Sequence, residues 1–283
     1  MRTACLILFA VVSAAQDESL DSPVATPLRN VELVDREGVA TRLAGFYRLS
    51  GEDLFRGFLG AGEVEIPYDR VAEIRVVAAV RPGGRMGAQV VLRSGNVVDA
   101  TFDEREGEQL LSGYAPFGRV TIFFRDIREL RLVGHTTRDD LPDYGAPAEG
   151  LDVRITDREG RANELVGFRR AVGENMIPGV RGAAAIAIPL RIVRRLEVTE
   201  DKETQPLLRA TATLKDGSTL DFRLPTYVEE TAYRGDAEFG IYRIRLGKIR
   251  DLVVHRETPV LREFSPPAAA GADEAEAGEQ PER

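Results

Sequence analysis

The sequence predicts an all-β protein built from two duplicated halves, each made of two strand-rich units of about 50 residues. The first observation is a repeat, because residues 31–48 (VELVDREGVATRLAGFYR) recur as residues 153–170 (VRITDREGRANELVGFRR) with ten of eighteen positions identical. The second is the pattern of side chains, which alternates between apolar and polar along much of the chain, whereas no apolar pattern at helical spacing extends over ten residues.

The repeat divides the chain into domains. At the same displacement of 122 positions, Ile66 falls on Ile188 and Gly118 falls on Gly240, and no gap is needed over about a hundred residues. Within the first half, a displacement of 56 lays residues 54–77 over 110–133, which indicates an older duplication. The predicted domains are a β domain at 31–134, with units 31–80 and 88–134, and a second β domain at 151–256, with units 151–200 and 207–256.

Each unit begins with a predicted β-hairpin. Four segments alternate apolar and polar residues on both sides of a polar turn: VELVDREGVATRL, VVLRSGNVVDATF, VRITDREGRANEL and ATLKDGSTLDFRL. Each turn contains a glycine, which can adopt the positive φ that short hairpin turns require. These glycines are Gly38, Gly95, Gly160 and Gly217.

Each unit ends with a second recurring element. Its four copies are GEVEIPYDRVAEIRV (62–76), GRVTIFFRDIRELRL (118–132), AAIAIPLRIVRRLEV (184–198) and GIYRIRLGKIRDLVV (240–254). In the first copy an alternating strand ends at Ile66, and apolar residues return at Val71, Ile74 and Val76. A step of three residues suits one helical turn and a step of two suits a strand, so the element is predicted to be strand, single turn, strand, with these four residues in the core.

This order of elements resembles the small β-barrels of the SH3-like and Sm-like type, in which a hairpin and a glycine-led strand precede one helical turn and a last strand. The resemblance covers residues 31–134 and 153–256 and implies a fold, not a function. The same pattern is compatible with one sandwich or barrel of eight to ten strands per half. Both packings stay open at this point.

The flanking segments predict an exported chain. Residues 1–15 combine a positive start with an apolar run and small residues at Ser13 and Ala15, as in a cleaved signal peptide, and the run is too short to span a hydrocarbon core of about 30 Å. The mature chain is expected to start at Gln16, to lack a transmembrane anchor and to be periplasmic or extracellular. Residues 16–30 are interpreted as a polar leader, 135–150 as a linker, and 257–283 as a mostly disordered acidic tail.

Composition excludes two classes of chemistry. Cleavage removes Cys5, the only cysteine, so the mature chain is expected to have neither a disulfide nor a thiolate nucleophile. The formal net charge is −8, and arginines alternate with acids instead of gathering on a basic face. Nucleic-acid binding is therefore not expected.

No catalytic, cofactor-binding or metal-binding residue is predicted. The two histidines, His135 and His255, follow the last strands of the two halves and so mark strand ends more readily than a shared site. Asp35 and Asp157 occupy DREG turns and not the D-[ST]-G loops of aspartic proteases, so they are interpreted as turn residues.

Three further candidates receive the simpler interpretation. Asp139, Asp140 and Asp143 lack the spacing of a calcium loop and are interpreted as a solvated acidic linker. The glycines of RPGGRMG (81–87) lead into a strand and not into a phosphate-binding helix. Sugar binding lacks support because the chain has no tryptophan, and core packing is expected for Phe55, Phe58, Phe123 and Phe124.

The sequence therefore predicts a non-catalytic binding or structural module of the cell envelope. Its expected partner is a protein or another envelope component, bound at a repeated face or at an exposed strand edge, and no cofactor is expected. The alternative is a hydrolase with a carboxylate-based site between the two halves.

Overall fold

A computed structural model describes residues 28–80, 84–137, 141, 150–200 and 208–257. The predicted signal peptide, nearly all of the predicted leader and tail, and most of the predicted linker lie outside these residues. The described chain is almost entirely β, which confirms the expected fold class. Its strands form one antiparallel sheet of 20 strands, and this sheet does not close on itself.

Ten strands, two single 3₁₀ turns and one short helix belong to the first half of the chain. Their bounds are β1 (Leu28–Asp35), β2 (Ala40–Arg48), β3 (Leu54–Leu59), β4 (Gly62–Pro67), η1 (Tyr68–Arg70), β5 (Val71–Val80), β6 (Met86–Leu92), β7 (Val97–Phe102), α1 (Glu104–Gly107), β8 (Leu110–Ala115), β9 (Gly118–Phe123), η2 (Phe124–Asp126) and β10 (Ile127–Thr136).

The second half repeats this series of elements. Their bounds are β11 (Leu151–Asp157), β12 (Ala162–Arg170), β13 (Met176–Arg181), β14 (Ala184–Pro189), η4 (Leu190–Ile192), β15 (Val193–Glu200), β16 (Leu208–Leu214), β17 (Thr219–Leu224), α2 (Thr226–Glu229), β18 (Ala232–Ala237), β19 (Gly240–Arg245), η5 (Leu246–Lys248) and β20 (Ile249–Glu257). Pairing registers recur with the sequence displacement, since Val31 opposes Leu132 and Val153 opposes Val254.

The strand pairings follow a single path through the molecule. In the first half the order is β9-β8-β2-β1-β10-β5-β6-β7-β3-β4. In the second half it is β19-β18-β12-β11-β20-β15-β16-β17-β13-β14. A pairing of β14 with β9 joins the two paths. Among the described residues, the sheet therefore starts at β19 and ends at β4.

Pairing departs from the 50-residue units of the sequence. The β1–β2 hairpin pairs with β10 and β8 instead of with β3, β4 or β5, and the β6–β7 hairpin pairs with β5 and β3. The two units of a half thus exchange their hairpins. An aromatic cluster links the exchanged parts, because Phe102 of β7 lies 6.3 Å from Phe55 of β3 and 5.0 Å from Phe124 of η2 between ring centroids.

The recurring closing element adopts the predicted form. A 3₁₀ turn at η1 separates β4 from β5, and Ile66, Val71, Ile74 and Val76 are all buried. The four predicted turn glycines all have positive φ, between 85° and 90°. The aromatic prediction is confirmed for Phe55 and Phe124, whereas the side chains of Phe58 and Phe123 are only half-buried.

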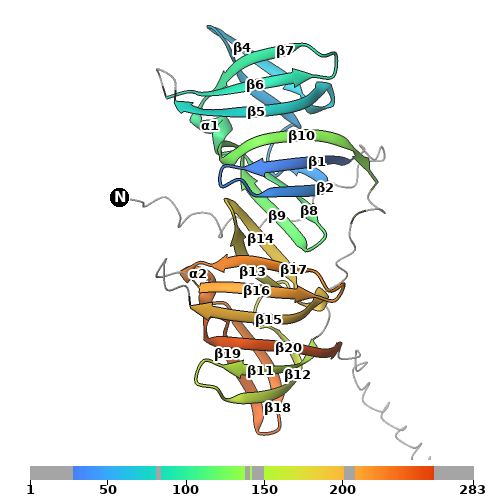
Figure 1. Ribbon diagram of the computed structural model, residues 1–283, viewed down its shortest axis with the longest axis vertical. Coiled ribbons are helices and arrows are strands. Elements are labelled where there is room, and N and C mark those ends of the chain that lie inside the picture. The colour runs from blue at the N-terminus through green and yellow to red at the C-terminus, as the bar shows by residue number, and fades with distance from the viewer. Residues whose placement is uncertain (1–27, 81–83, 138–140, 142–149, 201–207, 258–283) are drawn as a thin grey trace, which may run out of the picture.

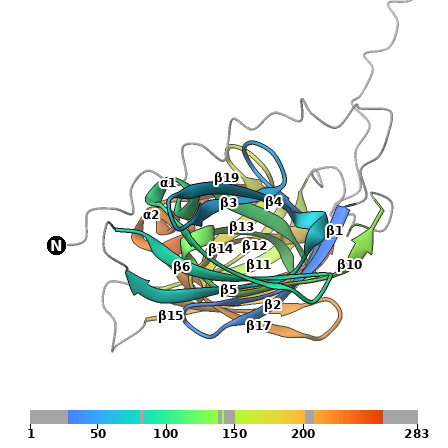
Figure 2. The ribbon, with the colours of Figure 1, turned by 90° about the horizontal axis from the view of Figure 1, so that it is seen from above.

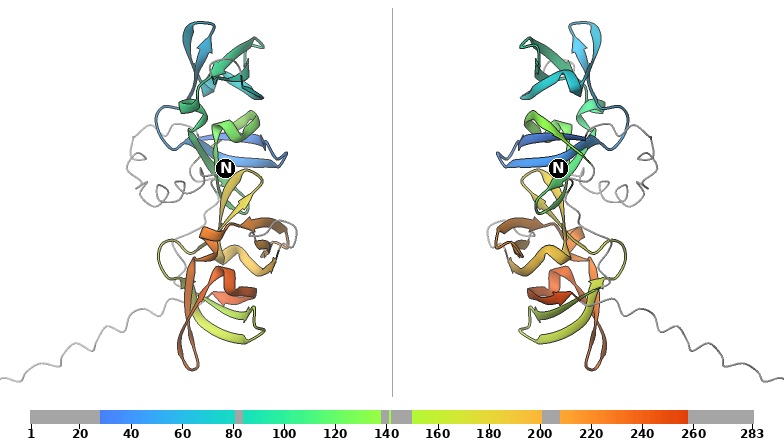
Figure 3. Two further views of the ribbon diagram at one scale, coloured as in Figure 1. Left: turned by 90° about the vertical axis from the view of Figure 1, so that its left-hand side faces the viewer. Right: turned by 90° about the vertical axis from the view of Figure 1, so that its right-hand side faces the viewer.

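The two halves are stacked along the long axis of the molecule (Figure 1). The β3–β4 hairpin lies at one end of the stack and the β18–β19 hairpin at the other, as two side views also show (Figure 3). Seen along the long axis, one half lies over the other, and α1 and α2 fall on the same side (Figure 2). The two halves therefore carry their short helices on one side of the stack.

Candidate functional site

The junction of the two halves is a pairing between strand edges. Three pairs of residues oppose one another across β14 and β9: Ala185 and Thr121, Ile186 and Val120, and Ala187 and Arg119. The hairpins that carry these strands point toward each other at the middle of the stack (Figure 1). Antiparallel edge pairing thus holds one half of the chain against the other.

Two close approaches fix the junction. A Cβ atom on Gly118, whose φ is +139°, would lie 2.1 Å from the carbonyl oxygen of Ala187, so only glycine fits there. The second approach is at the tip of the β13–β14 hairpin. There the buried carboxylate of Asp35 accepts the backbone N–H of Ala183 at Oδ2, and at Oδ1 it accepts the backbone N–H of Val39, both at 2.8 Å. Asp35 is therefore a turn residue that also binds the opposite half.

The counterparts of the junction strands lie at the two ends of the sheet. At a displacement of 122, β14 corresponds to β4 and β9 corresponds to β19. Among the described residues, β4 pairs only with β3, and β19 pairs only with β18. Their side chains are correspondingly exposed, including Glu63 and Glu65 on β4 and Ile241 and Arg243 on β19. The two ends of the sheet thus expose the same two kinds of strand edge that pair with each other at the internal junction.

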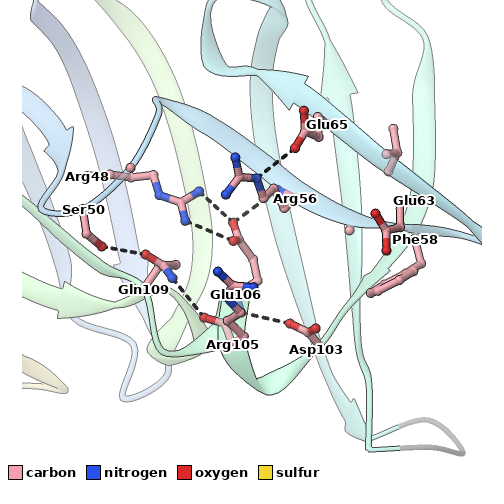
Figure 4. Close-up of a pocket in the computed structure, with 13 residues that line it drawn as sticks. Arg48, Ser50, Arg56, Phe58, Glu63, Glu65, Asp103, Arg105, Glu106 and Gln109 are labelled. Carbon is pink, nitrogen blue, oxygen red and sulfur yellow. Dashed lines mark hydrogen bonds and ion pairs between the residues drawn. The ribbon is translucent and has the colours of Figure 1, made fainter.

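A charged pocket adjoins the β4 edge. This cavity of about 340 Å³ lies between β3, β4, the residues that follow β2 and the helix α1 (Figure 4). At its inner wall the guanidinium of Arg48 donates to both carboxylate oxygens of Glu106, at 3.2 and 3.1 Å. Glu63 and Glu65 line the same pocket from the strand side.

The buried acid of this pocket is held by several donors. Helix α1 starts at an aspartate cap, where Asp103 accepts the N–H of Glu106 at 3.0 Å, and the side chain of Glu106 also accepts the N–H of Arg56 at 3.3 Å. Burial raises the pKa of Glu106, while the nearby Arg48 guanidinium opposes that rise. Because its oxygens already accept these bonds, Glu106 is arranged as a structural counterion.

The pocket chemistry belongs to the first half only. The counterparts of Arg48 and Glu106 are Arg170, which is half-buried, and Val228, which is buried. A second hollow, on the second half, contains His255, whose Nε2 lies 3.3 Å from Glu164 on β12. The two halves therefore share a frame and differ in the charges of their pockets.

The residues considered at the sequence level are spread over the fold. His135 and His255 are exposed on β10 and β20, at the ends of different halves. Asp157 lies in its own hairpin turn and accepts the N–H of Arg161 at 2.8 Å, as Asp35 does with Val39. Asp139, Asp140 and Asp143 lie outside the described residues. The structure brings none of these described residues together as a catalytic group.

Neither a metal-binding cluster nor a membrane-spanning helix is present among the described residues. No group of three or more histidine, cysteine, aspartate or glutamate side chains in this part of the chain is placed to hold a metal ion. None of the helices within the described ranges is long and apolar enough to cross a membrane. Comparison of the chain with family models, curated proteins and solved structures gives no match.

Sequence reasoning missed two parts of this site. Arg48 and Glu106 are 58 residues apart, and neither stands in a recognisable motif. One signal was available, since Glu106 aligns with Val228 at the displacement of 122 and so marks a position at which the two halves differ. The matched edges of β4 and β19 became visible only when the pairing of β9 with β14 was known.

Proposed function

We propose that this chain is an exported, non-catalytic binding or structural module of the cell envelope that engages its partner by strand addition at the ends of its sheet. The observation that carries this proposal is the pairing order, in which β4 and β19 terminate the described sheet while the equivalent edges are joined at the internal junction. Backbone groups on a strand edge are a ready template for another strand.

The repeated architecture supports the same interpretation. We infer that the halves are duplicated modules, each made of two small barrel-like units with exchanged hairpins, because element bounds and pairing registers recur together. Stacked repeats bury their faces against neighbours and leave the terminal faces exposed. A module of this kind works through its ends.

The carboxylates between the halves do not favour the hydrolase alternative. Both oxygens of Asp35 accept backbone N–H groups, and Glu37 pairs with the guanidinium of Arg223 at 3.1 Å. These groups hold the junction together.

The proposed export of the chain rests on its sequence alone. Residues 1–15 have the order of a cleaved signal peptide, with a basic start, an apolar run and small residues before Gln16. The first arm of the test is N-terminal sequencing of the chain recovered from the exported fraction, which is expected to begin near Gln16. An intact Met1 in the membrane fraction would contradict the export.

The second arm tests the edge itself. A photo-crosslinking amino acid at Val64 on β4 is expected to give a covalent adduct in intact cells, and the same residue at the exposed Val97 of the β6–β7 hairpin is the control. Adding Gly60→Asn beside the Val64 probe should remove the adduct, because this change fills the end of the edge. Equal labelling from both positions, or none from Val64, would refute strand addition at β4.

A further inference from the structure

We infer that the partner of the β4 edge is the β19 edge of a second copy of this chain, so that the protein associates head to tail. This inference rests on the proposed function and names its partner. The guide is the internal junction, because β4 and β19 stand 122 residues from β14 and β9. Transferring the register of the junction predicts that Glu63 opposes Arg243, Val64 opposes Tyr242, and Glu65 opposes Ile241.

Charge supports this register. Glu63 and Arg243 are exposed, and the transferred pairing puts these opposite charges directly across an antiparallel pair, where they stabilise it. The internal junction has Ala185 opposite Thr121 at this place, so the ion pair is a property of the terminal edges and is not inherited from the repeat.

Apolar exposure supports it as well. At the internal junction the ring of Phe117 lies 5.7 Å from the guanidinium carbon of Arg181. The counterparts of these two residues are Phe239, which is 72% exposed, and Leu59, which is 46% exposed. Head-to-tail pairing would bring these two exposed apolar side chains together.

The backbone at the terminal edges is already in the paired form. Gly240 has a φ of +119° and open space around its Cα, whereas Gly118 with a φ of +139° is packed against Ala187. Gly60 has a φ of +61° with open space, whereas Gly182 with a φ of +59° is packed against Asp35. Each exposed glycine therefore keeps the conformation that its counterpart needs for contact.

The contact is predicted to form an open array. The two edges differ, so the contact is heterologous, and such contacts form a ring only if the rotation between copies closes. The internal junction stacks the halves along the long axis (Figure 1), and β4 and β19 fall on the same side of the stack in the view along that axis (Figure 2). Repeating the junction between copies therefore extends the stack along its long axis instead of closing a ring.

Sedimentation velocity of the purified chain tests the inference. The concentration should run from about 1 µM to about 1 mM. The upper value is needed because the equivalent junction inside one chain forms at an effective concentration in the millimolar range, which the short connection between the halves provides. The wild type is expected to form a concentration-dependent series of oligomers. Glu63→Arg or Arg243→Glu should weaken association by about tenfold or more, and the double change should restore it. A wild type that stays monomeric throughout would overturn the inference.

Two blocked variants test the head-to-tail geometry. Gly60→Asn should block the β4 edge, because asparagine tolerates positive φ and its side chain fills the space that the partner needs. Arg243→Glu should weaken the β19 edge. At a concentration at which the wild type associates and this weakened contact does not form, each variant alone should stay monomeric, and a mixture should stop at one dimer. Dimers of Arg243→Glu alone would show a β4-to-β4 contact and would contradict the inference.

The two proposals can fail separately. If Val64 crosslinks in cells to a different protein while the purified chain stays monomeric, the inferred partner is wrong and the edge-binding function stands. If the purified chain associates but the charge exchange and Gly60→Asn have no effect, association uses another surface and the edge pairing is wrong.

Discussion

Replacing Glu106 by alanine is expected to lower the free energy of unfolding by about 3 kcal/mol, because a buried charge loses its partner. The side chain of Arg48 is only 2% exposed, and after the change its guanidinium keeps a bond to the carbonyl oxygen of Leu54 but loses both bonds to the carboxylate. The N–H of Arg56 also loses its acceptor. Urea unfolding at neutral pH measures the loss.

A neighbouring ion pair provides the matched control. Glu108 lies just after α1 and pairs with Arg125 at 3.1 Å, with side chains 54% and 33% exposed. Glu108→Ala should change the free energy of unfolding by less than about 1 kcal/mol. The double variant Arg48→Met/Glu106→Leu should be less destabilised than Glu106→Ala, because it leaves no buried charge. Equal losses for Glu106→Ala and Glu108→Ala would contradict a buried counterion.

Gly118→Ala is expected to open the junction between the halves. The new Cβ would meet the backbone oxygen of Ala187 at 2.1 Å, and a backbone atom of a paired strand cannot move away without separating β9 from β14. We expect faster hydrogen exchange at residues 119–121 and 185–187 and a loss of about 1–3 kcal/mol from overpacking, in addition to the strain of the backbone.

Gly240→Ala is the control that distinguishes backbone strain at a positive φ from the steric clash of a new Cβ atom. Gly240 shares the positive φ of Gly118, but a Cβ atom added to it would have no neighbouring atom within 4 Å, so the substitution carries the strain without the clash. Measured at a concentration where the chain is monomeric, Gly240→Ala should leave exchange at 119–121 unchanged. If both changes increase hydrogen exchange at residues 119–121 equally, then the close β9–β14 contact is not the reason why position 118 requires glycine.

The order of local elements, strand, turn, strand, was predictable from spacing along the chain, but the position of the turn was not. The step of three residues from Val71 to Ile74 was interpreted as the helical turn, whereas both residues belong to β5, in which a register shift between Val71 and Glu73 accommodates the step, and the 3₁₀ turn is at Tyr68–Arg70. Turn glycines were found for the same reason, since a two-sided alternating pattern around a polar tip leaves little choice of backbone conformation.

The pairing of strands was not predictable from spacing. Alternation tells which face of β1 is buried, but it does not tell whether β1 pairs with β5 of its own unit or with β10 of the next one. The structure uses β10, and β10 also pairs with β5. The exchange of hairpins is thus a choice among chemically similar edges, which is set by packing over the whole half.

The candidate site was predictable only in kind. An exposed strand edge was expected as a binding surface, but β4 and β19 could be identified only when the complete pairing order was known. The Arg48–Glu106 pair depends on a contact between β2 and α1, which belong to different units of the sequence. It therefore could not be predicted from any local sequence pattern.

The most direct test of the matched edges is a disulfide between them. Glu63→Cys and Arg243→Cys are combined in one chain that also carries Cys5→Ser, because directly opposed residues bring their Cβ atoms within about 5.5 Å, close to disulfide geometry. The two positions belong to β4 and β19, whose hairpins lie at opposite ends of the stack (Figure 3), so one chain cannot link to itself. Glu65→Cys with Arg243→Cys, which is out of register, is the control. Oxidation should give a ladder of covalent oligomers from the first pair and little from the control, whereas monomers from both, or equal ladders, would contradict the predicted pairing of β4 with β19.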